Sequence, residues 1–177
     1  MTKMELEQCI AAYGKDIYSF CKGLAKSTPE AEDLYQDTFL KAVELGGKID
    51  SGGNPKSYLL SIAIRIWKNR KRKYAWRNRI AGMDSFAEGQ EDKAADEEAG
   101  TSPETIFLCR EEQKAVRQAV GRLPEKYRLV VLLFYMEELS VDEIGAVLKI
   151  PAGTVKSRLH HARKQLEREL EDVFYET

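Results

Sequence analysis

The sequence has few of the residue types that build enzyme active sites or metal centres. Its 177 residues include only two histidines, His160 and His161, and three cysteines, Cys9, Cys21 and Cys109, which lie far apart and form no C-x-x-C pair. Adjacent residues on a helix point about 100° apart, so the two histidines cannot chelate one metal ion as i, i+4 pairs do. A P-loop, a dinucleotide-binding fingerprint and a nucleophile elbow are also absent from the sequence. We therefore expect a non-catalytic protein with no metal site, no cofactor and no small-molecule substrate.

Long apolar runs are missing as well. No stretch of the sequence approaches the length of a membrane-spanning helix, and its first residues lead into an amphipathic pattern rather than a signal peptide. The dispersed cysteines fit a reducing compartment, in which they serve as small buried hydrophobic residues. These features predict a soluble, cytoplasmic protein. The formal net charge is only −1, so any affinity for nucleic acid must come from an uneven distribution of charge.

Such an uneven distribution is present in the middle of the chain. Residues 51–83 contain no acidic residue, and their basic side chains are interleaved with Trp67, Tyr74 and Trp76. The basic residues of the second half of this segment are Arg65, Lys68, Arg70, Lys71, Arg72, Lys73, Arg77 and Arg79. Cations follow phosphates and aromatic rings stack on unpaired bases, so the composition predicts a surface for single-stranded nucleic acid. Trp67 follows the apolar Ile66, and a place in the core is an equally good interpretation for it.

The apolar periodicity predicts helices along the whole chain. In the first segment, apolar residues recur at helical spacing at Leu6, Ile10, Tyr13, Ile17, Phe20 and Leu24. A second helix is expected to begin with Thr28 as its cap and to continue through AEDLYQDTFLKAV, with its apolar and small residues on one face. The opposite face of this helix carries Glu32, Asp33, Gln36, Asp37 and Lys41. The glycine-rich loop LGGKIDSGGNP then leads to a third helix from Lys56 onward. No segment has the period of a strand, so the predicted fold class is all-α.

A strongly acidic segment separates two halves of the chain. The stretch GMDSFAEGQEDKAADEEAGTSP is rich in glycine, alanine and acids, and it shows no apolar periodicity. Such a segment cannot bury enough apolar surface to offset the entropy of ordering it, so we predict a flexible linker. The expected organisation is two small helical domains, residues 1–81 and 104–177, joined by the flexible acidic linker 82–103.

The second half contains the pattern of a helix-turn-helix. A helix is expected over residues 106–121, and the apolar run 129–135 is expected to form the central helix of the second core. They precede LSVDEIGAVLK, in which Ser140 and Glu143 have the spacing of a capping box. The following stretch, IPAGTVKSRLHHARKQL, carries one apolar face formed by Val155, Leu159, Ala162 and Leu166. Its remaining face is basic, and residues 145–166 contain no acidic residue. The second helix could therefore enter a DNA major groove, although a helical hairpin with a solvated basic face gives the same pattern.

Three stretches, in this order, resemble the sigma-70 family of bacterial RNA polymerase sigma factors. AEDLYQDTFLKAV resembles the core-polymerase-binding segment, commonly written A-E-D-L-x-Q-[ED]-x-F-L-x-[AV], and KSYLLSIAIRIWKNRKRK is similar to the following segment that meets the promoter −10 element. LPEKYRLVVLLFYMEELSVDEIGAVLKIPAGTVKSRLHHARKQL is similar to sigma region 4, including the motif G-T-V-[KR]-S-R-[LI]. Two domains and one linker, without the extra regions of housekeeping factors, resemble the extracytoplasmic-function (ECF) group.

The resemblance implies where the partners bind. The residues that would face the clamp helices of the polymerase largest subunit are Asp33, Gln36 and Asp37. Those that would meet the −10 strand are Arg65, Trp67, Lys68, Arg70, Lys71, Arg72 and Lys73. Those at the −35 major groove would be Thr154, Lys156, Ser157, Arg158, His160, His161 and Arg163. Many members carry Asn at the position of Arg65, and an aromatic residue or Arg at those of His160 and His161, so base preferences cannot be carried over at these positions.

The resemblance also implies further partners. These are the polymerase flap, promoter DNA and a membrane-associated anti-sigma factor that sequesters the protein until a stress signal arrives. A stand-alone helix-turn-helix repressor or activator, with the N-terminal half used for dimerisation, is the alternative of a different class, and an RNA-binding helical adaptor is a weaker one. A repressor does not need the acidic face of Asp33, Gln36 and Asp37 together with a second basic and aromatic cluster.

Overall fold

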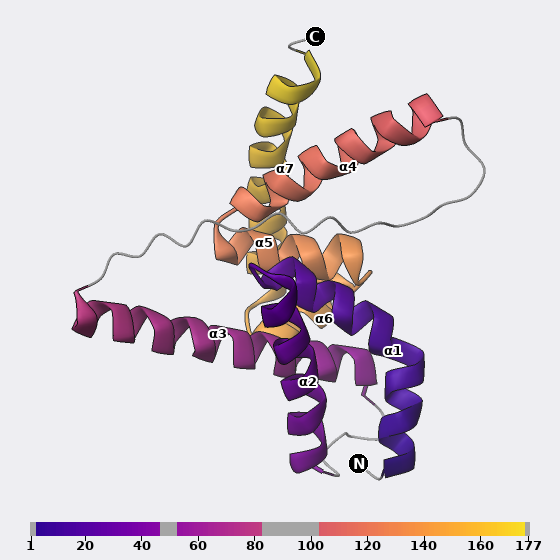
Figure 1. The fold of residues 1–177 in the computed structure, drawn as a ribbon, viewed down its shortest axis with the longest axis vertical. Coiled ribbons are helices and arrows are strands. Elements are labelled where there is room, and N and C mark those ends of the chain that lie inside the picture. The colour runs from indigo at the N-terminus through magenta and orange to yellow at the C-terminus, as the bar shows by residue number, and fades with distance from the viewer. Residues whose placement is uncertain (1–2, 47–52, 83–102, 176–177) are drawn as a thin grey trace. The chain divides into compact units, whose positions relative to one another are not determined.

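The computed structural model describes residues 3–46, 53–82 and 103–175, and the chain divides into two compact units, Met1–Asp92 and Lys93–Thr177. Every regular element among the described residues is helical, as the sequence predicts (Figure 1). Most of the predicted acidic linker and part of the glycine-rich loop lie outside the described residues. In the described part of the chain, no helix is both long enough and apolar enough to cross a membrane.

The first unit consists of three helices. They are α1 (Lys3–Leu24), α2 (Thr28–Glu44) and α3 (Pro55–Ala81), and each packs against the other two. Their shared core contains the fully buried side chains of Ile17, Phe20, Leu34, Leu59 and Leu60. Burial of large apolar side chains is the dominant favourable contribution to folding, at about 1.5–3 kcal/mol each, so these contacts hold the unit together.

Helix α2 begins one residue earlier than the sequence predicts. Its N-cap is Ser27 rather than Thr28, because Ser27 has an extended backbone and its Oγ accepts a hydrogen bond from the Glu30 backbone N–H at 3.4 Å. The Glu30 carboxylate in turn accepts from the Lys26 backbone N–H at 2.8 Å. Pro29 then lies in the first turn, where its missing N–H leaves no hydrogen bond unmade.

Helix α3 is longer than the part of it that packs against α1 and α2. Asn54 caps it by accepting a hydrogen bond from the Lys56 backbone N–H at 3.0 Å, and Gly82 ends it in the left-handed conformation. All the buried residues of α3 lie between Leu59 and Trp67. The second half of the helix projects beyond α1 and α2 (Figure 1), which leaves the basic segment in solvent.

The second unit is built around its last helix. Helices α4 (Pro103–Arg122), α5 (Glu125–Val131) and α6 (Val141–Leu148) all pack on α7 (Ala152–Tyr175) (Figure 1). One cluster of this core joins Leu123, Val131 and Ala162, with Val120, Tyr127 and Leu166 packed around it. The run of residues 129–135, predicted as a single central helix, is divided between α5 and the π-helical turn η1 (Leu132–Met136). The wider turn is closed by the Glu137 backbone N–H, which donates to the Leu132 carbonyl at 3.1 Å.

The helix-turn-helix is present as predicted. Ser140 and Glu143 form the capping box of α6, with reciprocal hydrogen bonds of 2.8 and 3.2 Å. Lys149 ends α6 in the left-handed conformation, with φ of 56°, and its backbone N–H donates to the Gly145 carbonyl. A side chain at Gly145 would place its Cβ 2.9 Å from the Ile150 carbonyl oxygen, so the close approach of the turn requires glycine there.

Candidate polymerase and DNA interfaces

An acidic face is exposed on α2. The buried side of this helix contains Ala31, Leu34, Thr38, Phe39 and Ala42, and the Thr38 hydroxyl is satisfied inside the unit by donating to the Leu34 carbonyl at 2.7 Å. Asp33, Gln36 and Asp37 are exposed on the other side, where the helical period places them. The structure therefore brings together the three residues that the sequence assigns to one surface.

Leu40 belongs to the same exposed face and was missed by the sequence analysis. It follows Asp33 by seven residues, or about two helical turns, and 63% of its surface is exposed. The helical period alone could have placed it there. An exposed leucine beside carboxylates gives this face an apolar contact as well as charge, a combination found at protein interfaces.

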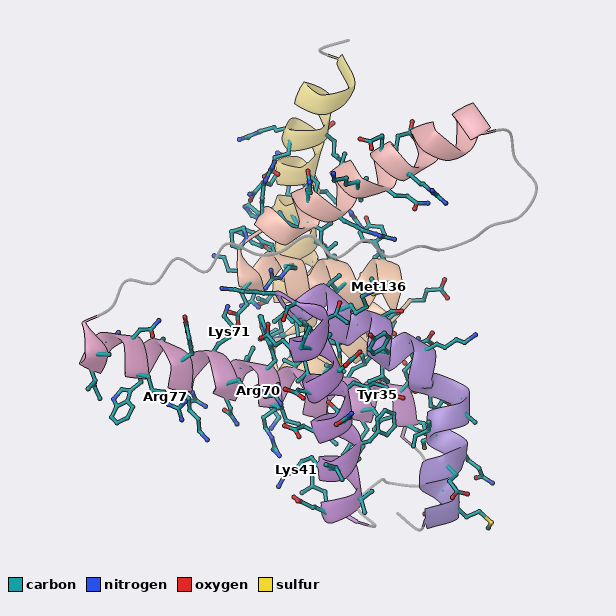
Figure 2. The ribbon with its side chains drawn as sticks, in the orientation of Figure 1. Tyr35, Lys41, Arg70, Lys71, Arg77 and Met136 are labelled. Atoms are coloured by element: carbon teal, nitrogen blue, oxygen red, sulfur yellow. The ribbon has the colours of Figure 1, made fainter. Side chains whose placement is uncertain are left out.

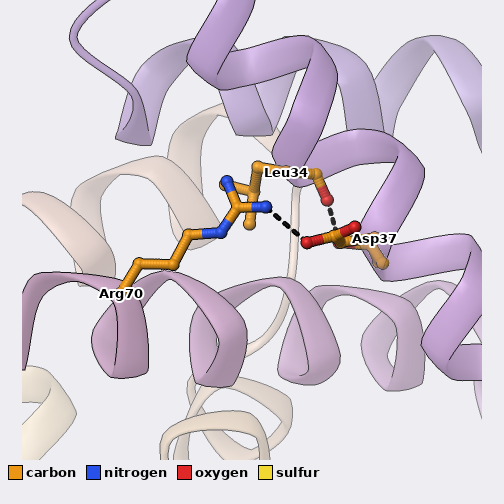
Figure 3. A network of polar contacts seen from close by, with 4 residues as sticks. Leu34, Asp37 and Arg70 are labelled. Atoms are coloured by element: carbon orange, nitrogen blue, oxygen red, sulfur yellow. Dashed lines mark hydrogen bonds and ion pairs between the residues drawn. The ribbon is translucent and has the colours of Figure 1, made fainter. Parts of the chain in front are cut away.

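Asp37 is held by an arginine from another predicted site. The Arg70 Nη2 lies 2.5 Å from the Asp37 Oδ2, and this ion pair joins α3 to α2 (Figure 3). The two side chains are 33% and 50% exposed, so solvent weakens the attraction and the pair adds only modestly to stability. The sequence assigned Asp37 to the polymerase surface and Arg70 to the DNA surface, and it contained no sign that they would meet.

Trp67 is not available for stacking on a base. It is only 2% exposed, and the Lys71 Nζ lies 4.6 Å from the centre of its ring. Trp67 follows Leu60 by seven residues and therefore lies on the core side of α3. The structure therefore agrees with the core interpretation of Trp67, whereas a contact of this residue with the −10 strand stays an untested prediction.

Of the remaining predicted −10 residues, Arg65 lies in the first half of α3 and the others lie in its projecting second half. Arg65, Lys68, Lys71, Arg72 and Lys73 are exposed. Figure 2 shows Arg70, Lys71 and Arg77 along this part of the helix, on different sides of it. Two aromatic side chains are exposed here as well, Tyr74 at 52% and Trp76 at 65%. Of the three aromatic residues that the composition placed in this basic segment, Tyr74 and Trp76 are therefore on its surface and Trp67 is not.

The predicted −35 residues lie on α7, whose buried side contains Val155, Leu159 and Ala162. Thr154 and Arg158 are half-buried at its edges, whereas Lys156, Ser157 and His160 are exposed. The exposed group lies in the first half of the helix, directly after the turn. This is the part of a second helix that can reach the base edges in a major groove.

Two of the predicted −35 residues are held by neighbouring helices. His161 is stacked on Tyr127 with ring centres 6.0 Å apart, and its Nδ1 lies 2.7 Å from the Ser157 carbonyl oxygen. The Nε of Arg163 donates to the Tyr135 hydroxyl at 2.6 Å. The two tyrosines come from α5 and η1, and the sequence analysis missed them because their role depends on where these elements cross α7.

One further charged group of this unit is partly removed from water. Burial lowers the pKa of the Arg128 guanidinium, while the nearby Glu125 raises it. An arginine remains protonated at neutral pH under such a shift. Its Nη1 donates to the Gly121 carbonyl at 3.4 Å, so Arg128 helps join α5 to the end of α4.

Two family models match the chain, and they match its two units. Sigma-70 region 2 matches residues 9–77, and sigma-70 region 4 matches residues 113–166. The ECF RNA polymerase sigma factor SigW of Bacillus subtilis is 33% identical over 165 residues, which cover 91% of this chain and 86% of that protein. The RNA polymerase sigma-H factor of Pseudomonas aeruginosa is 29% identical over 176 residues, which cover 98% of this chain and 90% of that protein.

Solved structures show the same fold. The sigma factor RpoE from Bartonella quintana, solved in complex with the anti-sigma factor NepR, matches with a TM-score of 0.76 and 22% identity, covering 94% of this chain and 97% of that one. CnrH, solved in complex with the cytosolic domain of CnrY, matches with a TM-score of 0.69 and 19% identity, covering 97% of this chain and 90% of that one.

The matches decide between the functions that the sequence left open. A stand-alone helix-turn-helix repressor has no need of a sigma region 2, and this chain carries both regions in the order of a sigma factor. Similarity to SigW extends over both of them. The chain therefore belongs to the sigma-70 family of RNA polymerase sigma factors, in its ECF group.

Proposed function

We propose that this sigma factor binds core RNA polymerase through the exposed face of α2, with Asp33, Gln36 and Asp37 against the clamp helices of the largest subunit. The observation that carries the proposal is the separation of charge on the first unit. Carboxylates and Leu40 lie on the outer face of α2, whereas the projecting half of α3 is basic. A sigma factor must bind a protein and DNA at the same time, and two surfaces of different chemistry allow this.

Helix α3, from Arg65 through its projecting half, supplies the surface for the −10 element. Arg65, Lys68, Lys71, Arg72 and Lys73 are exposed and can follow the phosphates of an opened strand. Arg70 can join them, although in the free protein it is paired with Asp37. Trp67 is excluded from this surface by its burial.

Helix α7 supplies the surface for the −35 element. Lys156, Ser157 and His160 reach the base edges, while Thr154 and Arg158 lie at the sides of the groove. His161 and Arg163 support the helix through Tyr127 and Tyr135, and their remaining polar groups face phosphates. The second unit also contacts the polymerase flap, so that both units are held at the spacing of the promoter elements. The functional domains are then residues 1–81 and 104–177, and the acidic segment between them joins the two.

An anti-sigma factor sequesters the protein in the cytoplasm until a stress signal releases it. The support is the fold that the chain shares with RpoE, which was solved in a complex with NepR. An inhibitor that binds the sigma factor one to one would capture the first sigma molecules that are made. Transcription of the target genes would therefore begin only when the amount of sigma factor exceeds the amount of inhibitor. Target transcript levels measured while expression of the sigma factor is raised in steps would test this. Transcript levels that rise in proportion to the sigma factor from its lowest level would contradict it.

Charge reversal on α2 tests the polymerase assignment. Asp33→Lys with Asp37→Lys should abolish binding to core polymerase, measured without DNA by fluorescence anisotropy of the labelled sigma factor. Exposed helix charges contribute only about 0.2–1 kcal/mol each to stability, so the double variant should remain folded. Glu7→Lys, at an exposed position of α1, makes the same charge change as either single substitution and is the matched control for Asp33→Lys and Asp37→Lys made separately.

A charge swap separates the polymerase contact from the internal ion pair. Asp37→Arg combined with Arg70→Asp keeps an ion pair between α2 and α3 but reverses the charge on the α2 face. We expect this swap to bind core polymerase as weakly as Asp37→Arg alone. If the swap restores wild-type binding, Asp37 acts through Arg70 and is not a polymerase contact.

A further inference from the structure

We propose that Trp76 is the side chain on which an unpaired promoter base stacks, at the end of a stripe on α3 formed by Arg65, Asn69, Arg72 and Trp76. The inference rests on the −10 function proposed for α3 and adds a residue to it. None of the residues assigned to the −10 element from the family resemblance provides an exposed ring, because Trp67 is buried.

The spacing of the four residues places them on one side of the helix. Their offsets along the chain are four, three and four, which is the period of one helix face. Trp76 follows Trp67 by nine residues, or about two and a half helical turns, so the two indoles point in opposite directions. Tyr74 follows Trp67 by seven residues, or about two turns, and therefore continues the core-facing side instead.

The stripe is exposed along its length. Trp76 is 65% exposed, and Arg65, Asn69 and Arg72 are also exposed. Within the described part of the chain, the Trp76 indole makes no hydrogen bond or ring contact, and neither Arg65 nor Arg72 forms an ion pair. Arg70, on another side of α3, differs because it is paired with Asp37.

One arginine of the stripe is oriented by its neighbour. The Arg72 Nη2 donates to the Asn69 Oδ1 at 2.5 Å, which holds the guanidinium one helical turn before Trp76. From Arg65 to Trp76 the stripe is about 16 Å long, at roughly 1.5 Å per residue. This length corresponds to about five base steps of one strand, at roughly 3.4 Å each. The stripe can therefore follow the phosphates of several nucleotides and end on a ring.

The charge of the surroundings identifies the occupant as nucleic acid. Residues 51–83 contain no acidic residue, so α3 itself carries no carboxylate that would repel a phosphate backbone. In a closed duplex the faces of the bases are covered by their neighbours, whereas in an opened strand a base can leave the stack and cover the indole. Trp76 should therefore contribute to the binding of opened DNA and little to the binding of duplex DNA.

The test uses holoenzyme assembled from core polymerase and this chain, with promoter DNA that is permanently unpaired around −10. Trp76→Ala should weaken binding to this DNA about 5- to 150-fold, the range for one base stacked on an aromatic side chain, and should leave binding to the fully paired promoter unchanged. Trp76→Phe should retain most of the affinity because it keeps a ring. Ile80→Ala is the matched control, since Ile80 is 68% exposed four residues further along α3 but has no ring.

An abasic scan then distinguishes stacking from a structural effect. Removing the unpaired bases one at a time should reveal one position at which wild type and Trp76→Ala bind equally well, because the stacking partner is gone from both. A loss of equal size at every abasic position, an equal loss on paired DNA, or no loss at all would overturn the inference.

Arginine variants distinguish a failure of this inference from a failure of the proposed function. If Arg65→Ala and Arg72→Ala weaken binding to opened DNA while Trp76→Ala does not, the −10 surface stands and only the role of Trp76 is wrong. If none of the three variants changes binding, the assignment of α3 to the −10 element is wrong as well. Trp76→Ala should unfold at the wild-type temperature, because its ring is outside the core.

Discussion

At the scale of single residues, side chains on one helix face have different freedom to bind DNA. On α7, Lys156 is exposed and forms no hydrogen bond or ion pair with another side chain in the described part of the chain. Arg163, seven residues later, is already bound to the Tyr135 hydroxyl. A free ammonium can reach the O6 and N7 acceptors of a guanine, whereas a guanidinium held at its Nε offers only its remaining N–H groups.

This difference predicts which residue reads sequence. Lys156→Ala should weaken holoenzyme binding by about 1–3 kcal/mol on the preferred −35 sequence, and much less on a variant that lacks the contacted base pair. Arg163→Ala should weaken binding by the same factor on every −35 sequence, because a phosphate contact carries no base information. The affinities of the two holoenzyme variants for a panel of −35 sequences would measure both effects. Uniform losses from both changes would mean that α7 grips only the backbone and that specificity lies elsewhere.

The two tryptophans of α3 predict opposite effects on stability. Trp67→Ala removes a fully packed indole and should lower the free energy of unfolding by about 3–5 kcal/mol. Trp76→Ala removes an exposed indole and should change it by less than about 0.5 kcal/mol. Urea unfolding followed by circular dichroism gives both values. Similar losses for the two variants would show that the projecting half of α3 packs on another part of the protein.

At the scale of elements, the turn between α6 and α7 determines how the second helix is presented. The capping box at Ser140 begins α6, and Lys149 in the left-handed conformation ends it. The Ile150 backbone N–H donates to the Gly145 carbonyl at 3.0 Å and folds the turn back on α6. The direction of α7 therefore depends on how closely the two backbones approach at Gly145.

Gly145→Ala should destabilise the protein and Gly121→Ala should not. The added methyl group at Gly145 would lie 2.9 Å from the Ile150 carbonyl oxygen, and forcing the backbones apart costs about 1–3 kcal/mol. Gly121 lies in α4 with nothing within 4 Å of an added Cβ, so alanine there should stabilise by about 0.5–1 kcal/mol. Thermal and urea unfolding of the two variants would check this pair. A gain in stability from both would mean that the turn tolerates a side chain at Gly145.

At the scale of the whole molecule, the chain is two compact units, each with its own core. The core of the first comes from α1, α2 and α3, and the core of the second from the helices that surround α7. Units with separate cores can unfold independently, in which case no single free energy of unfolding describes the protein. Their separation also allows one partner surface to change without disturbing the other.

Independent unfolding is testable by calorimetry with one variant from each core. Trp67→Ala should lower the temperature of one transition, and Gly145→Ala should lower that of the other, even if the two overlap in the wild type. The double variant should show both shifts, because distant and independent changes add. A single transition that both changes lower together would indicate one cooperative unit.

Much of the local structure could be predicted because it depends on neighbours in the sequence. The capping box at Ser140, the apolar side of α7 and the exposed acids of α2 all follow from spacings of three and four residues. The cap of α2 was misplaced by one residue, since Ser27 and Thr28 are adjacent hydroxyl residues and only the backbone distinguishes them. The chemistry of the three candidate surfaces was predictable for the same reason, because charge and aromatic content are local properties.

The sequence by itself determined that the chain is helical, that its charge is divided among separate surfaces, and which motifs those surfaces carry. Tertiary structure decided which side chains are free to act. Only packing shows that Trp67 is core and Trp76 is exposed, that Asp37 is paired with Arg70, and that Arg163 is bound to Tyr135. Asp37 and Arg70 are 33 positions apart in the chain, and Tyr135 and Arg163 are 28 positions apart. A local sequence pattern cannot specify such pairs, because they depend on the point at which two packed helices cross.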